Sequence, residues 1–306
     1  MKILRILFAG IFLSLITCSF AEEAVFNIAT YNIRQYNEGD KAAGNGWENR
    51  LPVIAGLIRF HDFDIFGTQE GFKHQLEDLK GLLPGYDYTG VGRDDGREEG
   101  EHSAIFYDTE KFELLDQGDF WLSETPEKPG LGWDAACVRI CSWGKFLHKP
   151  SGKTFKYYNL HLDHVGVKAR AESCRLVKSI IEEEKENLPV FLSGDFNVDQ
   201  HNEIYGILTS LDGLKDSYTK AGLVYALNGT YNAYQTDGYT DSRIDHIFVS
   251  DDVNVEKYGV LTDTYRTQVM MNEPLQKTDA PSEISIIKYQ ARTPSDHFPV
   301  MLKVRF

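Results

Sequence analysis

Short apolar runs bounded by polar residues and glycines recur along the chain, and stretches with helical spacing separate them. The clearest run, residues 189–193, lies between polar residues and a glycine, which is typical of a short strand buried on both faces. Gly194 lets the backbone turn at the end of this strand, so we expect Asp195 and Asn197 at the rim of a sheet. Asp and Asn are common turn formers after strands, so this position alone does not indicate chemistry.

The same apolar pattern predicts the remaining elements. Strands are predicted over residues 25–33, 64–69, 104–107, 136–143, 153–162, 243–250 and 299–306. Helices are predicted over residues 47–60, 71–83, 168–186 and 203–211. A mobile glycine-rich loop, a polar turn region and an irregular segment are predicted over residues 90–100, 120–129 and 261–292. Because strands and helices alternate without a linker or repeat, we predict one α/β domain over residues 22–306, with two packed sheets and helices outside.

The beginning of the chain follows a different pattern. A basic start, an apolar run over residues 6–16 and small residues around Ala21 predict a secretory signal peptide over residues 1–21. The apolar run is too short to span a bilayer. Acylation of Cys18 in a lipoprotein is the less favoured alternative, because Thr17 matches the usual acylation signal poorly. We therefore expect export across the bacterial inner membrane, as a monomer with no transmembrane segment in the mature chain.

Charge and cysteine usage narrow the possible partners. The chain has 46 acidic and 32 basic residues, a formal net charge of -14, and such a surface repels long nucleic acids. A metal ion could nevertheless supply positive charge locally.

Cys137 and Cys141 lie four residues apart in a predicted strand, which separates them by about 13 Å. This is too far for a disulfide, so we expect thiols, and no zinc-binding spacing is present.

Polar residues of the kinds found in hydrolytic sites lie at six strand ends or in the turns after them. They are Asn32, Glu70, His161, Asp195 with Asn197, Asp245, and Asp296 with His297. Each alone has an ordinary structural explanation: His161 could be a core histidine, for example, and Asp245 could pair with Arg243. Random polarity should not recur at so many strand ends, however, and α/β folds place their sites at the carboxyl ends of strands. Together these residues indicate an active site.

Six motifs that contain these residues occur in a fixed order. They read TYNI (residues 30–33), QE (69–70), NLH (159–161), GDFN (194–197), RIDH (243–246) and SDHFP (295–299). In this order they resemble the motifs of the endonuclease/exonuclease/phosphatase superfamily, which includes DNase-type nucleases, sphingomyelinases, inositol polyphosphate phosphatases and poly(A) deadenylases. The resemblance spans residues 25–306, and the segments 47–50 and 161–164 are similar to a deadenylase-like bacterial branch. It implies a four-layer α/β/β/α sandwich of two packed mixed sheets flanked by helices.

The resemblance also implies a metal site and a place for the attacking water. Glu70 would be the principal ligand of Mg²⁺ or Mn²⁺, with Asn32 and Asp296 beside it. Hard oxygen ligands suit Mg²⁺. Asp195 and Asn197 would position the nucleophilic water and a phosphate oxygen. A phosphate ester is anionic, so a metal ion and hydrogen-bond donors must neutralise it before water can attack in line.

Further roles implied by the resemblance fall to histidines and to two charged residues. His297 would act as general base or phosphate ligand, oriented by Asp245, and His161 would contact the phosphoryl oxygens. The apurinic branch has Tyr at the position of His161, which argues against a role at abasic sites. Arg139 and Glu101 are weaker candidates for substrate contacts, because a surface strand charge and a loop charge explain them equally well.

These observations lead to one main hypothesis and two alternatives. The main hypothesis is an exported Mg²⁺- or Mn²⁺-dependent phosphoesterase that hydrolyses phosphodiester or phosphomonoester bonds by in-line attack of water. Small phosphorylated molecules or nucleotides are the favoured substrates, because the acidic charge disfavours long nucleic acids. The first alternative is an extracellular nuclease. The second is a catalytically inactive binding module on the same fold, and the presence of every expected residue type argues against it.

Overall fold

The computed structural model describes residues 22–184, 186–210, 213–269, 279 and 281–306. The predicted signal peptide, including Cys18, lies outside the described residues. Within the described part, no helix combines the length and the apolar character that crossing a membrane requires. The three described cysteines, Cys137, Cys141 and Cys174, are free thiols, as predicted.

Two mixed sheets form the centre of the structure. In the described residues, the first sheet has seven strands, in the order β10 (Leu223–Tyr225), β12 (Asn254–Val260), β15 (Val300–Arg305), β1 (Val25–Asn32), β2 (Ile65–Gln69), β4 (Ile105–Asp108) and β3 (Tyr86–Thr89). The second sheet, counted over the same residues, has six, in the order β5 (Phe112–Trp121), β6 (Ile140–His148), β7 (Lys153–His161), β8 (Val190–Asp195), β11 (Asp245–Ser250) and β9 (Leu214–Asp216).

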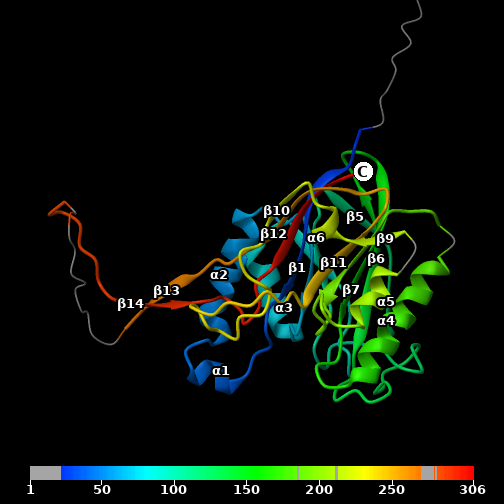
Figure 1. Cartoon of the computed structure of the whole chain (residues 1–306), viewed down its shortest axis with the longest axis horizontal. Coiled ribbons are helices and arrows are strands. Elements are labelled where there is room, and N and C mark those ends of the chain that lie inside the picture. Colours follow the sequence, from blue (N-terminus) through cyan, green and yellow to red (C-terminus); the bar gives the residue numbers. More distant parts are fainter. Residues whose placement is uncertain (1–21, 185, 211–212, 270–278, 280) are drawn as a thin grey trace, which may run out of the picture.

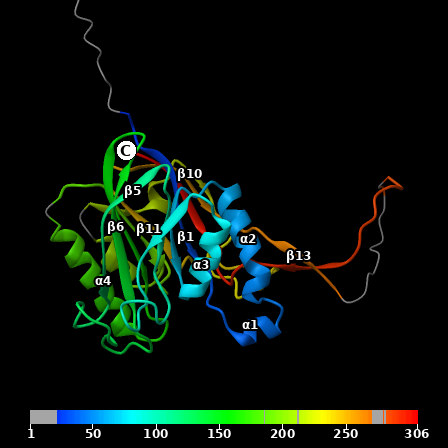
Figure 2. The same cartoon turned by 180° about the vertical axis from the view of Figure 1, so that it is seen from behind.

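Helices cover the outer faces of these sheets. Helices α2 (Trp47–Phe60) and α3 (Lys73–Leu82) lie on one side of the strands, and α4 (Val167–Glu182) lies on the other, with α5 (Tyr205–Thr209) beside it (Figures 1 and 2). Two short helices, α1 (Glu38–Ala42) and α6 (Ser217–Lys220), complete the set in the described residues. The arrangement confirms the predicted four-layer sandwich.

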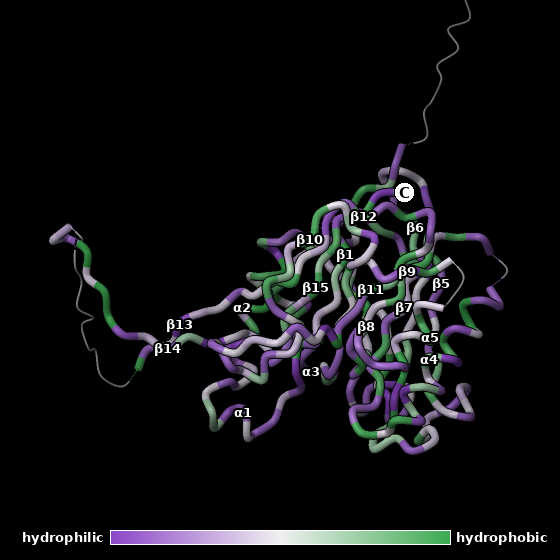
Figure 3. Tube along the Cα trace, in the orientation of Figure 1, coloured by the Kyte–Doolittle hydropathy of each residue, from purple (hydrophilic) through white to green (hydrophobic). Residues whose placement is uncertain are grey.

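The alternation of side chains along each strand divides the core into layers. Phe26 and Ile28 of β1 belong to the buried cluster between the sheets, where Phe26 stacks on Phe155 of β7 at 5.2 Å between ring centroids. Ala29 of the same strand belongs instead to the cluster with Ile54 of α2. Figure 3 shows hydrophobic residues along the central strands. Burial on both faces explains why these strands read as nearly continuous apolar runs.

A buried polar layer joins the two sheets directly beneath the strand ends. Gln69 Nε2 donates to Asn159 Oδ1 at 2.7 Å, and Asn159 Nδ2 donates to the carbonyl of Thr68 at 2.9 Å. A Cβ at Gly67 would lie only 2.3 Å from Asn159 Oδ1, so only glycine allows this close approach of the sheets. Buried polar groups with satisfied hydrogen bonds fix one arrangement of a core. The layer therefore sets how the ends of β2 and β7 lie relative to each other.

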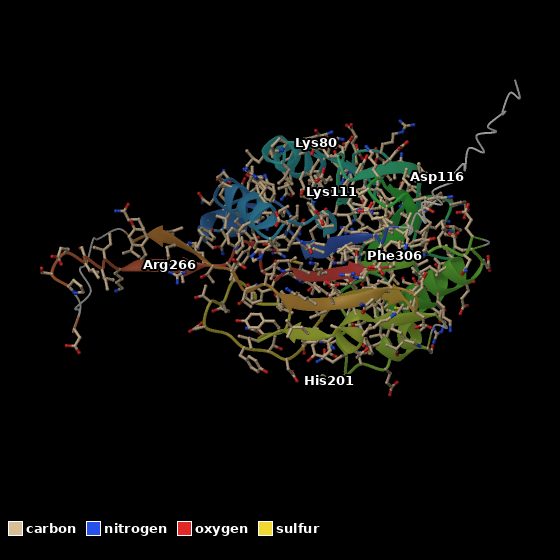
Figure 4. All side chains as sticks on the ribbon, turned by 90° about the horizontal axis from the view of Figure 1, so that it is seen from above. Lys80, Lys111, Asp116, His201, Arg266 and Phe306 are labelled. Carbon is tan, nitrogen blue, oxygen red and sulfur yellow. The ribbon has the colours of Figure 1, made fainter. Side chains whose placement is uncertain are left out.

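The predicted elements differ from the structure mainly where strands are polar. Strand β5 was not predicted, and its burial is low at most central positions because it is an edge strand. The predicted strand 136–143 begins only at Ile140, so Cys137 lies in the preceding loop. Within the segment predicted to be irregular, β13 (Tyr265–Gln268) pairs antiparallel with β14 (Tyr289–Arg292), and this pair extends away from the sandwich (Figure 4, where Arg266 marks it).

Candidate active site

Strand pairing brings the predicted residues to one rim of the sandwich. In the first sheet, Asn32 lies opposite Gln69 in the parallel pair β1–β2, so Glu70 follows directly beside it. In the second sheet, Asp195 lies opposite His161 of β7 and opposite Asp245 of β11. These ends face a cavity of about 330 Å³. Of the ten candidates, eight line it: Glu70, Glu101, Arg139, His161, Asp195, Asn197, Asp296 and His297.

The remaining two candidates, Asn32 and Asp245, hold residues that line the cavity. Asn32 is fully buried, and its Nδ2 donates to Glu70 Oε1 and to Asp195 Oδ2, both at 3.0 Å. Its Oδ1 accepts from the backbone N–H of Arg34 at 3.0 Å. The amide of Asn32 thus joins two carboxylates that come from different sheets. In this orientation its nitrogen, and not the oxygen expected of a metal ligand, faces the carboxylates.

Glu70 is held in place by its backbone as well as by hydrogen bonds. Its φ of 65° lies in the left-handed region, which is uncommon for residues other than glycine. The backbone N–H of Gln35 donates to Glu70 Oε2 at 3.1 Å. Burial alone would raise the pKa of Glu70, but His297, the amide of Asn32 and Arg34 together lower it. Strained backbone at a cavity is typical of functional sites, and this carboxylate is ionised.

Arg34 is a cavity residue that the sequence pattern did not indicate. Its Nη1 lies 3.4 Å from Asp296 Oδ2 and 3.8 Å from Glu70 Oε2, and its Nε donates to Asp40 Oδ2 at 2.9 Å. Burial alone would lower the pKa of Arg34, but Asp296 and Asp40 raise it above its usual range. The guanidinium therefore offsets part of the negative charge at this end of the cavity.

The acidic end of the cavity retains an excess of negative charge. Burial, followed by the nearby Asp245 carboxylate, raises the pKa of Asp195 to about 7. Burial and the nearby Glu70 likewise raise the pKa of Asp296. Carboxylates held this close disfavour each other's ionised form unless a cation neutralises them. Ligand atoms of Glu70, Asp195 and His297 lie within 4.8 Å of one another. The oxygen donors and their mutual repulsion fit a hard divalent cation such as Mg²⁺ or Mn²⁺.

His297 and Asp245 form the hydrogen-bonded pair that we predicted. His297 Nδ1 lies 2.9 Å from Asp245 Oδ2, and its Nε2 lies 3.7 Å from Asp195 Oδ2. Burial disfavours a charged ring, but Asp245 and Asp195 outweigh it and hold the pKa of His297 well above its usual range. The alternative that Asp245 pairs with Arg243 is wrong, because Arg243 Nη1 pairs with Asp216 at 3.4 Å. The arrangement places a cationic imidazole beside the carboxylates.

His161 lies on the other side of Asp195. Its Nε2 is 3.5 Å from Asp195 Oδ2 and 3.2 Å from Asn197 Nδ2. Asn197, whose φ of 49° is left-handed, also donates from Nδ2 to the carbonyl of Leu162 at 3.0 Å. Burial, followed by the nearby Arg139 guanidinium, holds the pKa of His161 well below its usual range. The two histidines therefore flank one carboxylate in opposite charge states.

The glycine-rich loop contributes two charged residues, Arg93 and Glu101, to the lining of the cavity. The loop is closed by hydrogen bonds from Gly92 N to the carbonyl of Arg97 (3.0 Å) and from Arg93 N to the carbonyl of Glu101 (3.1 Å). Arg93, which we did not predict, donates from Nη1 to Glu101 Oε2 at 2.6 Å. Burial raises the pKa of Glu101 to about 7, although Arg93 opposes the shift. The loop thus offers a buried carboxylate and an arginine to the cavity.

Asp163 holds together two loops that form another part of the cavity wall. Its Oδ2 accepts from the backbone N–H groups of Ala136 and Cys137, both at 3.1 Å, and its Oδ1 accepts from those of Val165 (2.9 Å) and Gly166 (2.7 Å). Burial alone would raise the pKa of Asp163, but these backbone hydrogen bonds lower it to about 2. The carboxylate thereby joins the loop after β7 to the loop before β6, and Cys137 and His164 of these loops line the cavity.

We expect Asp163→Asn to lower the stability of the fold in a pH-dependent way. The introduced amide nitrogen faces N–H donors, and an unsatisfied buried donor costs about 1–3 kcal/mol. Because the folded pKa lies below the usual value of about 3.9, the ionised carboxylate stabilises the fold fully above about pH 4 and progressively less towards about pH 2. Melting temperatures of both proteins across this range should show a gap that narrows with acid. A gap independent of pH would contradict the assignment.

Comparisons with known proteins show one matching family model and several similar proteins. A family model described as "Endonuclease/Exonuclease/phosphatase family" matches residues 29–297. A mannosyl-6-phosphatase of Bacteroides thetaiotaomicron has a solved structure that is 53% identical, with a TM-score of 0.85, over 92% of this chain and 100% of that chain. An endonuclease/exonuclease/phosphatase of Bacteroides vulgatus is 34% identical, with a TM-score of 0.77, over 92% and 98%. An uncharacterized protein of Acanthamoeba polyphaga mimivirus is 33% identical over 161 residues, which span 50% of this chain and 60% of that protein.

Proposed function

The chain belongs to the endonuclease/exonuclease/phosphatase family, and we propose that it is a divalent-metal-dependent phosphatase acting on phosphomonoesters of small hydroxylated molecules, with mannose 6-phosphate or a mannosyl 6-phosphate as the first candidate. The observation that carries the proposal is the 53% identity, over 92% of this chain, with a mannosyl-6-phosphatase. The residues that line the cavity support the choice, because they include an acidic cluster that fits a metal ion and a separate Arg93–Glu101 pair.

The size and polarity of the cavity suit such a substrate. A volume of about 330 Å³ is at the lower end of the range typical of small-molecule sites. Glu70, Asp195 and Asp296 form the acidic cluster, where we place the phosphate, and the glycine-rich loop contributes Arg93 and Glu101. A buried carboxylate beside an arginine can accept hydrogen bonds from hydroxyls while its charge remains paired. We assign the sugar to the Glu101 end.

The proposed mechanism is in-line attack of water on the phosphoryl group. Glu70 and Asp296 would hold the metal ion, which neutralises phosphate charge and lowers the pKa of bound water. Asn32 fixes Glu70 and Asp195 through its amide, so the two carboxylates keep their separation. Asp195 accepts the proton of the attacking water, since a carboxylate with a pKa of about 7 is suited to a general base.

The flanking groups stabilise the charge that develops on the phosphoryl oxygens. His297, held cationic by Asp245, donates from Nε2 and acts as a phosphate ligand. Asn197, which lines the cavity beside His161, would contribute an N–H of its side-chain amide. Preorganised donors in a buried site are worth about 10²–10³ each in rate. These residues are thus all expected to affect kcat.

A substrate panel tests the proposal. Release of product would be measured with Mg²⁺ and with Mn²⁺ from mannose 6-phosphate, bis-p-nitrophenyl phosphate and single-stranded DNA. We expect the highest kcat/KM on the monoester. Equal or faster hydrolysis of the diester or of DNA would overturn the phosphomonoesterase assignment while leaving the catalytic residues in place.

We expect no measurable binding to duplex DNA, even at low salt without metal. The net charge of -14 opposes the phosphate contacts on which DNA binding depends. A protein with many phosphate contacts loses about 10³-fold or more in affinity between low and moderate salt. Fluorescence anisotropy of labelled duplex DNA over a salt series is the measurement. Tight binding with a steep salt dependence would instead favour the nuclease alternative.

We propose in addition that the first 21 residues direct export, as their charge and hydrophobicity pattern predicts. Expression in a bacterial host should yield a chain beginning at residue 22 in the periplasm. N-terminal sequencing of the purified protein decides this, because an intact start at Met1 would contradict cleavage and a modified Cys18 would indicate a lipoprotein.

A further inference from the structure

Each of the three nitrogens of the Arg139 guanidinium has a polar partner. Its Nε lies 3.4 Å from Asp163 Oδ2, its Nη1 lies 3.1 Å from His161 Nδ1, and its Nη2 lies 3.1 Å from His164 Nδ1. The side chain is only 5% exposed. Although Arg139 lines the cavity, each of its three nitrogens is therefore engaged with an imidazole ring or a carboxylate.

These contacts fix where the protons lie on the two rings. A guanidinium has only N–H donors and keeps its charge in proteins. The Nδ1 atoms of His161 and His164 must therefore accept hydrogen bonds from Arg139, since an N–H on Nδ1 would meet an N–H of Arg139. A neutral imidazole that accepts through Nδ1 carries its proton on Nε2. Each ring is then an N–H donor on the side away from Arg139.

For His161, the Nε2 atom faces the reacting centre. It lies 3.2 Å from Asn197 Nδ2, and one hydrogen of that amide is directed to the carbonyl of Leu162. A neutral ring can accept at only one nitrogen, and the charged guanidinium is a stronger donor than the amide of Asn197. Nδ1 therefore accepts from Arg139, and Nε2 carries the proton, 3.5 Å from Asp195 Oδ2. His161 and Asn197 both line the cavity, and N–H donors there are suited to an anionic oxygen.

His297 has a carboxylate at Nδ1 where His161 has a guanidinium, so the two histidines are not equivalent. Asp245 lies 2.9 Å from His297 Nδ1, so a carboxylate stands behind that ring. The corresponding carboxylate for His161 would be Glu101, but its Oε2 lies 3.8 Å from His161 Nδ1, and Arg139 is closer. One ring is thus backed by a carboxylate and the other by a guanidinium, on the two sides of Asp195.

We propose that Arg139 is a positioning residue that fixes His161 and His164 as neutral Nε2–H tautomers, so that both rings present N–H donors to the oxygens of the substrate. The proposal rests on the proposed function for the identity of that substrate. His161 then stabilises the phosphoryl oxygens as a neutral donor and does not transfer a proton to the leaving group. That proton must come from another group or from water.

Nitrogen NMR of the histidine rings in the intact, Mg²⁺-loaded protein tests this without any substrate. Long-range ¹H–¹⁵N correlation distinguishes an imidazole protonated on Nε2, on Nδ1 or on both, and His161→Gln assigns the relevant signals. We expect His161 and His164 to be protonated on Nε2 alone, and His297 on both nitrogens. A proton on Nδ1 of His161 would overturn the proposal. Since no turnover is involved, failure here is distinguishable from failure of the substrate panel.

Variants add a second readout. Arg139→Met removes all donors, and Arg139→Lys keeps a charge but cannot reach both rings and Asp163 at once. In both we expect loss of the uniform Nε2–H signal of His161 and a decrease in kcat of at least about tenfold, in line with loss of a positioned donor. Arg175→Met is the matched control, because Arg175 is 54% exposed and pairs with Glu172 away from the cavity. An unchanged tautomer and kcat in a folded Arg139→Met protein would contradict the proposed role.

Discussion

Chelation of divalent ions is expected to abolish phosphate release, and Glu70→Gln is expected to make activity depend on much higher metal concentrations. Glu70, Asp195 and Asp296 crowd carboxylates into one part of the cavity, and Arg34 and His297 offset their charge in part. Replacing Glu70 with the isosteric amide removes the ionised ligand but leaves the shape of the site. Loss even of groups that support metal ligands costs about 10–100-fold in metal affinity, so the loss here should be at least as large.

Two measurements check this expectation. Calorimetric titration with Mn²⁺ gives the affinity directly, and activity as a function of metal concentration shows whether turnover recovers as the site fills. Glu48→Gln serves as the matched control, because Glu48 is 54% exposed and its charged contact in the described residues is Lys41, at 3.8 Å. Full activity of the wild type in excess chelator would contradict the metal assignment, as would equal metal affinity of Glu70→Gln and wild type.

Loss of the His297 ring is expected to lower kcat by about 10²–10³, the range typical of a preorganised donor to developing negative charge. Asp245→Asn should cost less, because the imidazole remains. The double variant should be little worse than His297→Ala alone, since groups that act as a unit show non-additive effects. Steady-state kinetics on the three variants, together with their melting temperatures, separates a catalytic loss from simple destabilisation.

The pH dependence of kcat in Asp245→Asn should shift in a direction that can be tested. The carboxylates of Asp245 and Asp195 outweigh burial and hold the pKa of His297 above its usual range, so the ring stays cationic as the pH rises. Replacing Asp245 with asparagine removes part of this support, and the alkaline limb of the kcat profile should move to lower pH. Asp216→Asn is the control, because its partner Arg243 lies outside the set that lines the cavity. Multiplicative losses in the double variant, or an unchanged alkaline limb, would contradict the pairing.

The rim of the active site could be predicted because strand ends are easy to place. Strands buried on both faces read as apolar runs, and the polar residue that follows each run is visible in the sequence. Parallel pairing then brings Asn32 beside Glu70, and His161 beside Asp195. Only the chain's order of motifs was needed to expect Asp245 beside His297. These contacts depend on backbone register, which short-range patterns specify well.

The residues that tune the site were harder to predict because they lie in loops. Arg34 and Arg93 follow no periodic pattern. Arg34 pairs with Asp296, which is distant in the chain, and Arg93 meets Glu101 only because the loop between them closes. The role of Asp163 depends on four backbone N–H groups from two loops, which no local motif reveals. Strands β5 and β12 were not predicted because their solvent-facing positions are polar.

The most direct test of the central claim is the rate of phosphate release from mannose 6-phosphate by wild type and by Asp195→Asn, prepared and loaded with Mg²⁺ in the same way. Asp195 lies between the two histidines, 3.5 Å from His161 Nε2 and 3.7 Å from His297 Nε2, and it accepts from Asn32. If this cavity hydrolyses the phosphomonoester, kcat should fall by at least about 10² in a variant that still melts cooperatively. Phosphate release at the wild-type rate by folded Asp195→Asn would show that the reaction does not take place in this cavity.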